Sequence, residues 1–158
     1  MHPATSHKNR KGFTLIELLV VIAIIATLAV LVFVALDPIR RFQESRNARR
    51  WTDVSTLNTA IHTYTLDNQG VLPTGLAADA NTYQLGTCAS GAATLCTGAE
   101  AACVDLTTPL TAYLKSIPMD PLTGSSATTG YSVEVDANNI VTIAACSAER
   151  SETIQISQ

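Results

Sequence analysis

A single carboxylate interrupts the most apolar stretch of the chain. The segment from Phe13 to Leu36 spans 24 residues, and Glu17 is its only charged side chain. About 20 apolar residues are enough to cross a lipid bilayer. An ionisable group inside such a segment is costly to hold there and commonly marks a function. Glu17 is therefore the first candidate site, and the chemistry it offers is pairing with a positive charge.

Cysteines form the second chemically distinctive set: Cys88, Cys96, Cys103 and Cys146. No pair has the Cys-x-x-Cys spacing and no histidine lies nearby, so a zinc site is not expected. A loop-rich segment gains about 2–4 kcal/mol from each disulfide. We therefore expect two disulfides. Four cysteines allow three connectivities, of which we favour Cys88–Cys96 with Cys103–Cys146.

Residue types that support catalysis are scattered along the chain. His2 and His7 precede the apolar segment, and His62 stands alone on a predicted helix, where we expect a surface residue. No serine lies in a nucleophile motif, and no glycine-rich loop is suited to holding a phosphate. We predict no catalytic residue, no enzymatic activity and no small-molecule substrate.

The first twelve residues are polar and basic, with Lys8, Arg10 and Lys11 close together. This layout, ahead of a long apolar run, is typical of a targeting segment. A secretory signal would have about 7–15 apolar residues followed by a small-residue cleavage site. Here the run is longer and no such site follows it. The predicted cut lies before the run, between Gly12 and Phe13.

The stretch KGFTLIE places Gly12, Phe13 and Glu17 in a characteristic spacing, with Glu17 fifth from Phe13. It resembles the class III signal of type IV pilins and type II secretion pseudopilins, closely from Lys11 to Ala29 and more loosely beyond. The resemblance implies that a prepilin peptidase cuts after Gly12 and methylates the new amine of Phe13. The alternative is an ordinary membrane-anchored protein with an isolated glutamate.

Charge near the apolar segment gives conflicting information on topology. Three basic residues precede Phe13, and five arginines lie between Arg40 and Arg50. The positive-inside rule, applied to these numbers, would keep the C-terminal part in the cytoplasm. The cysteines instead fit an oxidising compartment, and the resembled family exports this part. We expect a single-pass inner-membrane protein with its C-terminal domain outside the cytoplasm.

The five arginines also raise the question of a basic binding patch. Such a patch could contact nucleic acid or lipid head groups. Aromatic residues do not alternate with these arginines, and the whole chain has a formal net charge of −3. We therefore expect a solvated helical face and no nucleic-acid partner.

A second helical pattern follows the apolar segment. One apolar stripe recurs every three or four residues: Trp51, Val54, Leu57, Ile61 and Tyr64. Pro38 is expected to kink or break the helix, and the DNQG sequence ending at Gly70 to stop it. We predict one long helix from Phe13 to about Asp67, apolar all round in its first half.

Short elements are predicted after Gly70. They are a strand around Tyr83, a helix over 107–118, a hairpin over 131–145 and a strand over 153–157. Period-two alternation supports the hairpin. The expected fold class is α+β: a long N-terminal helix packed on a small antiparallel sheet, as in pilins. The domains are a cleaved leader at 1–12, a membrane-spanning and filament-core helix at 13–36 and a soluble domain at 37–158.

A calcium site is the one cofactor that the resemblance raises. Some secretion pseudopilins hold calcium in a loop that begins near the equivalent of IPMDP. This chain matches that loop at Pro118, Asp120 and Pro121 and lacks the aromatic pattern that usually follows. We expect no cofactor, with calcium as the alternative.

The predicted function is that of a structural subunit in a type IV pilus-like extracytoplasmic filament. Its partners would be copies of itself, a prepilin peptidase and an inner-membrane assembly platform. We expect Glu17 of one subunit to meet the Phe13 amine of its neighbour. A type II secretion pseudopilin is one alternative, and a minor pilin that binds a ligand or DNA at the fibre tip is another. The expected disulfides favour a long-lived pilus.

Overall fold

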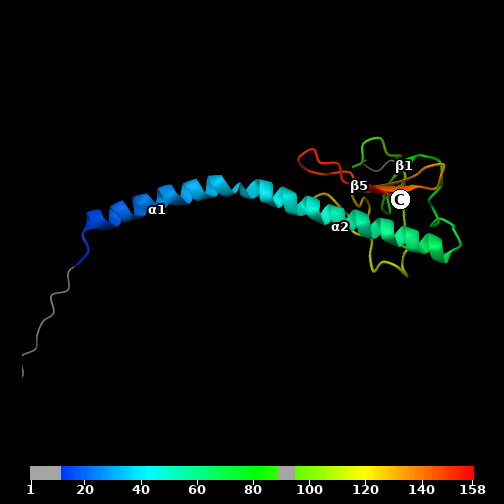
Figure 1. Cartoon of the computed structure of the whole chain (residues 1–158), viewed down its shortest axis with the longest axis horizontal. Helices are drawn as coiled ribbons and strands as arrows, with labels where there is room; N and C mark the ends of the chain where they lie inside the picture. The colour runs from blue at the N-terminus through cyan, green and yellow to red at the C-terminus, as the bar shows by residue number, and fades with distance from the viewer. Residues whose placement is uncertain (1–11, 89–94) are drawn as a thin grey trace, which may run out of the picture. The chain divides into compact units, whose positions relative to one another are not determined.

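The computed structural model describes residues 12–88 and 95–158. The predicted leader therefore lies almost wholly outside the described residues. The chain divides into two units, Met1–Arg40 and Arg41–Gln158, and each is considered by itself. Figure 1 colours the elements in chain order.

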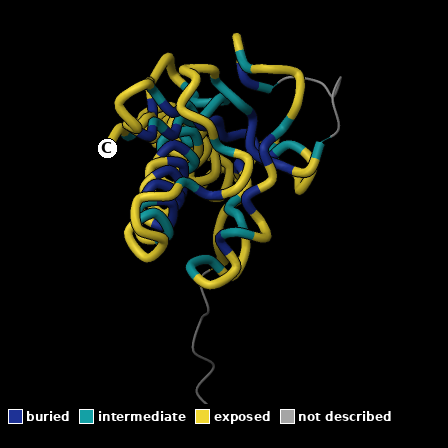
Figure 2. Tube along the Cα trace, turned by 90° about the vertical axis from the view of Figure 1, so that its right-hand side faces the viewer, coloured by how far each residue is buried: buried dark blue, intermediate teal, exposed yellow. Residues whose placement is uncertain are grey.

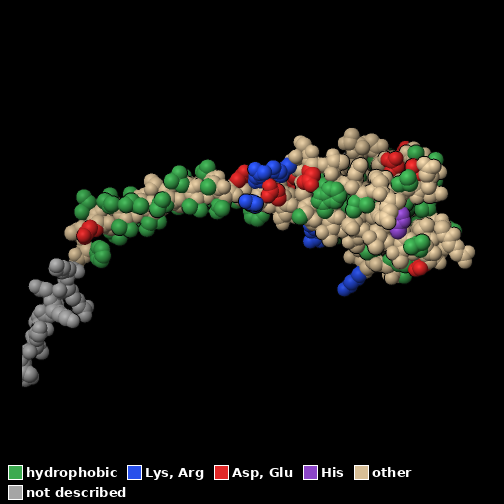
Figure 3. Space-filling model, viewed as in Figure 1, with side chains coloured by type: hydrophobic (Ala, Val, Ile, Leu, Met, Phe, Trp, Pro, Cys, Tyr) green, Lys and Arg blue, Asp and Glu red, His purple; other side chains and the backbone are tan. Residues whose placement is uncertain are grey.

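Helix α1, Leu15–Leu36, is the main element of the first unit. Thr14 is its N-cap, and Thr14 and Glu17 form a capping box, in which each side chain accepts a hydrogen bond from the other residue's backbone N–H. Such boxes satisfy N–H groups that have no partner inside a helix. None of the α1 residues is buried, and Figure 3 shows hydrophobic side chains along its visible surface.

Helix α2, Pro38–Asp67, begins directly after Asp37. The helix predicted from Phe13 begins at Leu15 and is interrupted at Asp37, whose left-handed backbone (φ 39°) separates α1 from α2. The Asp37 carboxylate accepts the N–H of Arg40 at 3.3 Å. Asp before Pro is a favourable helix start, because proline fits the first helical position.

The C-terminal end of α2 agrees with the predicted stop signal. The N–H of Gly70 donates to the carbonyl of Thr65 at 2.8 Å, and that of Gln69 to Leu66 at 3.3 Å. Gln69 has a φ of 58°, and Gly70 has a φ of 88°. This is the Schellman arrangement, which satisfies the last helical carbonyls.

Within the described residues, five strands form one sheet, in the order β2-β1-β3-β4-β5. Their bounds are Thr82–Leu85 for β1, Cys103–Val104 for β2, Tyr131–Val135 for β3, Val141–Ala145 for β4 and Gln155–Ser157 for β5. The predicted strand around Tyr83, the hairpin and the last strand are confirmed. The predicted α+β fold, a long helix packed on a small sheet, is confirmed. The sheet is mixed rather than antiparallel throughout, because β2 pairs in parallel with β1.

The hydrophobic core lies between α2 and the sheet. Val54, Leu57 and Ile61 are fully buried, which confirms the middle of the predicted stripe. Tyr64 is partly buried against the core, whereas Trp51 remains 39% exposed. Figure 2 shows buried residues (dark blue) and exposed residues (yellow) interspersed along the trace of this unit. The sheet contributes the inward residues of its central strands: Tyr131, Val133, Val135, Val141 and Ile143.

The predicted helix over 107–118 is wrong, because this segment forms a series of turns. The hydroxyl of Thr111 donates to the carbonyl oxygens of Thr107 at 2.9 Å and Thr108 at 2.8 Å. One carboxylate oxygen of Asp105 accepts the N–H of Thr107 at 2.8 Å. Side-chain bonds of this kind compete with the regular helical ladder.

Candidate functional site

The N-terminal segment Gly12–Glu17 is the first candidate site. One carboxylate oxygen of Glu17 accepts the backbone N–H of Thr14 at 2.8 Å and its hydroxyl at 2.7 Å. A carboxylate in the first turn also interacts favourably with the helix dipole. Glu17 therefore has a partner inside its own chain, and that partner is neutral.

Phe13 and Gly12, unlike Glu17, have no structural role in the described chain. Phe13 is 90% exposed. A Cβ atom built on Gly12 would meet no atom of the described chain within 4 Å. The backbone of Gly12 also lies outside the left-handed region that would require glycine. Neither residue contributes to packing, so any requirement for them must come from outside the folded chain.

The disulfide pairing differs from the expected one. Cys88 is bonded to Cys103, with Cα atoms 5.3 Å apart, and Cys96 is bonded to Cys146, with Cα atoms 4.7 Å apart. The favoured pairing of Cys88–Cys96 with Cys103–Cys146 is therefore wrong. The reason is the missed strand β2: its parallel register sets Cys103 opposite Gln84 in β1, a few residues before Cys88.

A charged cluster on α2 is the second candidate site. Arg50 is fully buried, and its guanidinium donates to Asp120 at 2.6 Å and to Glu149 at 2.9 Å. Arg46 donates to the same Glu149 carboxylate at 2.7 Å. The expectation that the arginines form a solvated face is wrong for Arg50, because its charge is compensated by carboxylates far away in the sequence.

The same cluster holds the turn after β4. The Asn47 amide accepts the N–H of Glu149 at 3.0 Å and donates to its carbonyl at 2.9 Å. Arg150 and Ser151 follow with φ of 62° and 55°, a conformation that non-glycine residues rarely adopt. The Trp51 indole donates to Glu152 at 2.9 Å. Contacts from residues 46–51 of α2 thus fix residues 149–152 before β5.

Electrostatics favours the ionised form of both carboxylates that face Arg50. The hydrogen bond from Arg46 is the main cause that lowers the pKa of Glu149, to about 2. Burial raises the pKa of Asp120, but hydrogen bonds from Arg50 and from the backbone outweigh burial, so the pKa lies below its ordinary value. The cluster is therefore a set of ion pairs at neutral pH.

Asp120 does not have the surroundings of a calcium ligand. Its oxygens accept hydrogen bonds from Arg50, from the N–H groups of Leu122 and Thr123 and from the Thr123 hydroxyl. Calcium needs six to eight oxygen ligands in total, and this carboxylate already faces a cation. The described residues contain no group of three or more His, Cys, Asp or Glu side chains that could hold a metal.

Two single residues, His62 and Arg50, differ from what the sequence analysis expected. His62 is half-buried rather than on the surface, and its Nε2 has no hydrogen-bond partner among the described residues. Arg50 could have been recognised from spacing, because it precedes Val54 by four residues and Leu57 by seven. It therefore lies on the buried stripe.

The described chain is α+β, and its N-terminal helix is apolar and exposed. Glu17 in the first turn of that helix belongs to a capping box. This organisation is pilin-like. The helical segment Leu15–Asp67 contains a stretch apolar and long enough to cross a membrane. Residues 7–33 match the family model of the prokaryotic N-terminal methylation motif. No curated protein and no solved structure matches the chain.

The motif is the class III signal of type IV pilins and pseudopilins, and over these residues it supports a pilin-like or pseudopilin-like precursor. In general terms, the signal implies processing by a prepilin peptidase and assembly into a filament. It indicates a structural protein rather than an enzyme. The apolar helix fits membrane anchoring with a filament outside.

Proposed function

We propose that the chain is a structural subunit of a type IV pilus-like extracytoplasmic filament. It is made as a precursor and held in the cytoplasmic membrane by α1, with residues 37–158 outside the cytoplasm. A prepilin peptidase cuts between Gly12 and Phe13 and methylates the Phe13 amine. An inner-membrane assembly platform then transfers the subunit into the fibre.

The observation that carries this proposal is the complete exposure of α1. Its 22 residues contribute nothing to a core, although nearly all are apolar. At 1.5 Å per residue they extend about 33 Å, close to the hydrocarbon thickness of a bilayer. A surface this apolar requires an apolar environment. The membrane supplies it before assembly, and the α1 helices of other copies supply it in the filament.

Gly12 supports the proposed cleavage site. Since a side chain at Gly12 would meet nothing in the described chain, folding gives no reason for glycine there. A narrow protease cleft gives one, because glycine lets the extended backbone enter. Changing Gly12 should therefore affect processing and leave the fold intact.

Glu17 supports assembly by charge pairing. Its partner in the single chain, Thr14, is neutral. Cleavage creates a positive amine at Phe13, and in a staggered bundle this amine can meet Glu17 of a neighbour. A mismatched stagger would leave both charges unpaired in an apolar environment, which is strongly unfavourable. Glu17 thereby sets the axial register of incoming subunits.

A type II secretion pseudopilin would share this N-terminal segment. The two disulfides favour the pilus, because covalent bonds protect a fibre that stays exposed outside the cell. A minor pilin at the fibre tip would instead be present in few copies per filament.

Electron microscopy of cells with and without the gene tests the proposal. We expect filaments that contain this chain along their length, and labelling only at the tips would instead identify a minor pilin. Glu17→Ala should be cut and inserted normally but should enter filaments only when mixed with the unmodified chain. Filaments of normal amount and symmetry from Glu17→Ala alone would refute the role in register.

A further inference from the structure

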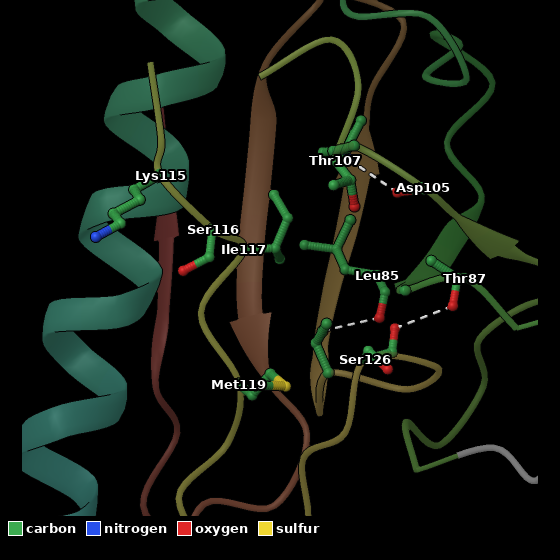
Figure 4. A pocket seen from close by; sticks show the side chains of 12 residues that line it. Leu85, Thr87, Asp105, Thr107, Lys115, Ser116, Ile117, Met119 and Ser126 are labelled. Carbon is green, nitrogen blue, oxygen red and sulfur yellow. Dashed lines mark hydrogen bonds between the residues drawn. The ribbon is translucent and has the colours of Figure 1, made fainter. Parts of the chain in front are cut away.

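A cavity of about 320 Å³ lies beside the end of β1, and its lining includes no residue of the arginine cluster. Its floor is apolar, with Leu85 and Leu106 each 1% exposed and Ile117 partly buried. Met119 is 45% exposed and lies in the lining. Figure 4 shows Leu85 and Ile117 in the centre of the group of lining side chains.

Backbone hydrogen bonds fix the walls of the cavity. The N–H and the hydroxyl of Thr129 both donate to the carbonyl of Leu85, at 2.9 and 2.8 Å. The N–H of Thr87 donates to the carbonyl of Ser126 at 3.1 Å. A Cβ on Gly86 would lie 2.1 Å from the carbonyl oxygen of Ala127, so the backbones at Gly86 and Ala127 are in close contact and leave no room for a side chain. The walls formed by residues 85–87 and 126–129 are therefore set by the backbone rather than by movable side chains.

The lining contains two charged residues, Lys115 and the exposed Asp105. Figure 4 shows Lys115 extending away from Leu85 and Ile117. One oxygen of Asp105 accepts the N–H of Thr107 at 2.8 Å. The other polar side chains of the lining are hydroxyls: Thr87, Thr107, Ser116, Ser126 and Thr129. A ligand in this cavity would meet apolar surface with a hydroxyl rim.

We propose that this cavity binds a small neutral molecule that is mostly apolar and carries one hydroxyl or amide group. A preformed apolar cavity with a few polar groups is the usual form of a small-molecule site. Rigid walls prevent the cavity from collapsing, so an occupant gains contacts without paying for reordering of the protein. The binding function is independent of filament assembly and would be displayed on the globular unit.

A second cavity of the same volume makes a useful contrast. It lies along α2 and is also about 320 Å³, but its helical side consists of small, mainly hydroxyl residues: Ser55, Thr56, Thr59, Ala60 and Thr63. The Thr56, Thr59 and Thr63 hydroxyls each donate to the carbonyl four residues earlier, at 2.8 Å. It lacks the buried apolar floor of the first cavity, so the proposal concerns the first cavity alone.

Methionine labelling provides the test. The chain has two methionines, Met1 and Met119. Full-length protein labelled at the methionine methyl carbons therefore gives two signals, which Met119→Leu assigns. Benzyl alcohol is the probe, with benzoate and benzylammonium as charged molecules of the same ring size. We expect benzyl alcohol to shift the Met119 signal saturably, and the charged molecules to bind at least about tenfold more weakly.

Two substitutions distinguish binding of benzyl alcohol in the cavity from its non-specific partitioning into apolar surroundings. Ser126→Trp changes an exposed residue of the rim and should abolish the saturable shift. Thr59→Trp changes an exposed residue of the second cavity and should leave it unchanged. Equal, linear shifts of Met1 and Met119 would overturn the proposal, as would binding that survives Ser126→Trp. Preferential binding of benzoate or benzylammonium would overturn the assignment to a neutral ligand.

Discussion

Helix α1 and the globular unit from Arg41 to Gln158 differ in what happens to their apolar side chains. The globular unit buries its own apolar residues between α2 and the sheet. Helix α1 buries none of its residues. The difference teaches that the globular unit supplies its own apolar core, whereas α1 presents an apolar surface that requires an apolar environment from outside the chain.

The treatment of charge follows the same division. Arg50 is fully buried, and two carboxylates of its own unit compensate its charge. Glu17 has only neutral donors from Thr14 in the described chain. A charge whose counter-ion lies in the same chain stabilises that fold. A charge without one can recognise another molecule.

Removing Arg50 should have the largest effect on the globular unit. Arg50→Met leaves the carboxylate of Asp120 buried without its cation, which should lower the free energy of unfolding by about 3–5 kcal/mol. Denaturant titration followed by the fluorescence of Trp51, the single tryptophan, measures this change. Arg49→Met is the matched control, because the Arg49 side chain is 65% exposed. Its effect should be at most about 1 kcal/mol, and similar losses in both variants would contradict the assigned role of the cluster.

The two disulfides should differ in their contributions. Chain entropy predicts about 4 kcal/mol for Cys96–Cys146, which closes a separation of 50 residues, and about 3 kcal/mol for Cys88–Cys103, which closes 15. Replacing each pair by serines and comparing the free energies of unfolding tests this order. Non-reducing peptide mapping should find no free thiol in the globular unit. Peptides that join Cys88 to Cys96 would refute the pairing described above.

Acid should weaken the globular unit through Glu149. The pKa of Glu149 falls from an ordinary 4.5 to about 2 in the fold, mainly because of the hydrogen bond from Arg46. The unfolded chain then binds the proton more readily than the folded one, so the stabilisation is present above about pH 4.5 and is lost as the pH falls toward 2. Glu149→Gln should flatten this part of the stability–pH curve. A curve unchanged by that substitution would show that Glu149 is not the responsible group.

Changes in α1 should have the smallest effect on the globular unit. Leu28 is 55% exposed and contacts no core. Leu28→Ala should alter the free energy of unfolding of the globular unit by no more than about 0.5 kcal/mol. Leu57→Ala, in the core, is the contrasting variant and should cost about 2–5 kcal/mol. A large effect of Leu28→Ala would mean that α1 and the globular unit do not stabilise themselves separately.

Local sequence signals predicted most of the fold. Alternation of apolar and polar residues gave the β3–β4 hairpin, and the stripe through Val54, Leu57 and Ile61 gave the buried side of α2. The spacing of Gly12, Phe13 and Glu17 gave the N-terminal signal, which the matched methylation motif supports. These features depend on neighbours within a few residues, so a single sequence contains them.

The features that were missed depend on residues distant in the sequence. Strand β2 is only two residues long and has no periodicity of its own. Because β2 was not predicted, the disulfide pairing of Cys103 was predicted incorrectly as well. The partners of Arg50 lie 70 and 99 residues away, so nothing local indicates that its charge is compensated. The turns over 107–118 arise from threonine hydroxyls that compete with helical bonds, although the proline positions favoured a helix.

The mass of the mature N-terminal peptide tests the central claim most directly, because that claim requires a partner outside the chain to act on Gly12 and Phe13. In cells with a prepilin peptidase, the chain should begin at Phe13 and carry one N-methyl group. Gly12→Leu should remain uncut and membrane-bound while its globular unit unfolds at the same denaturant concentration as before. A mature chain that begins elsewhere, or Gly12→Leu processed to the normal mass, would contradict the account.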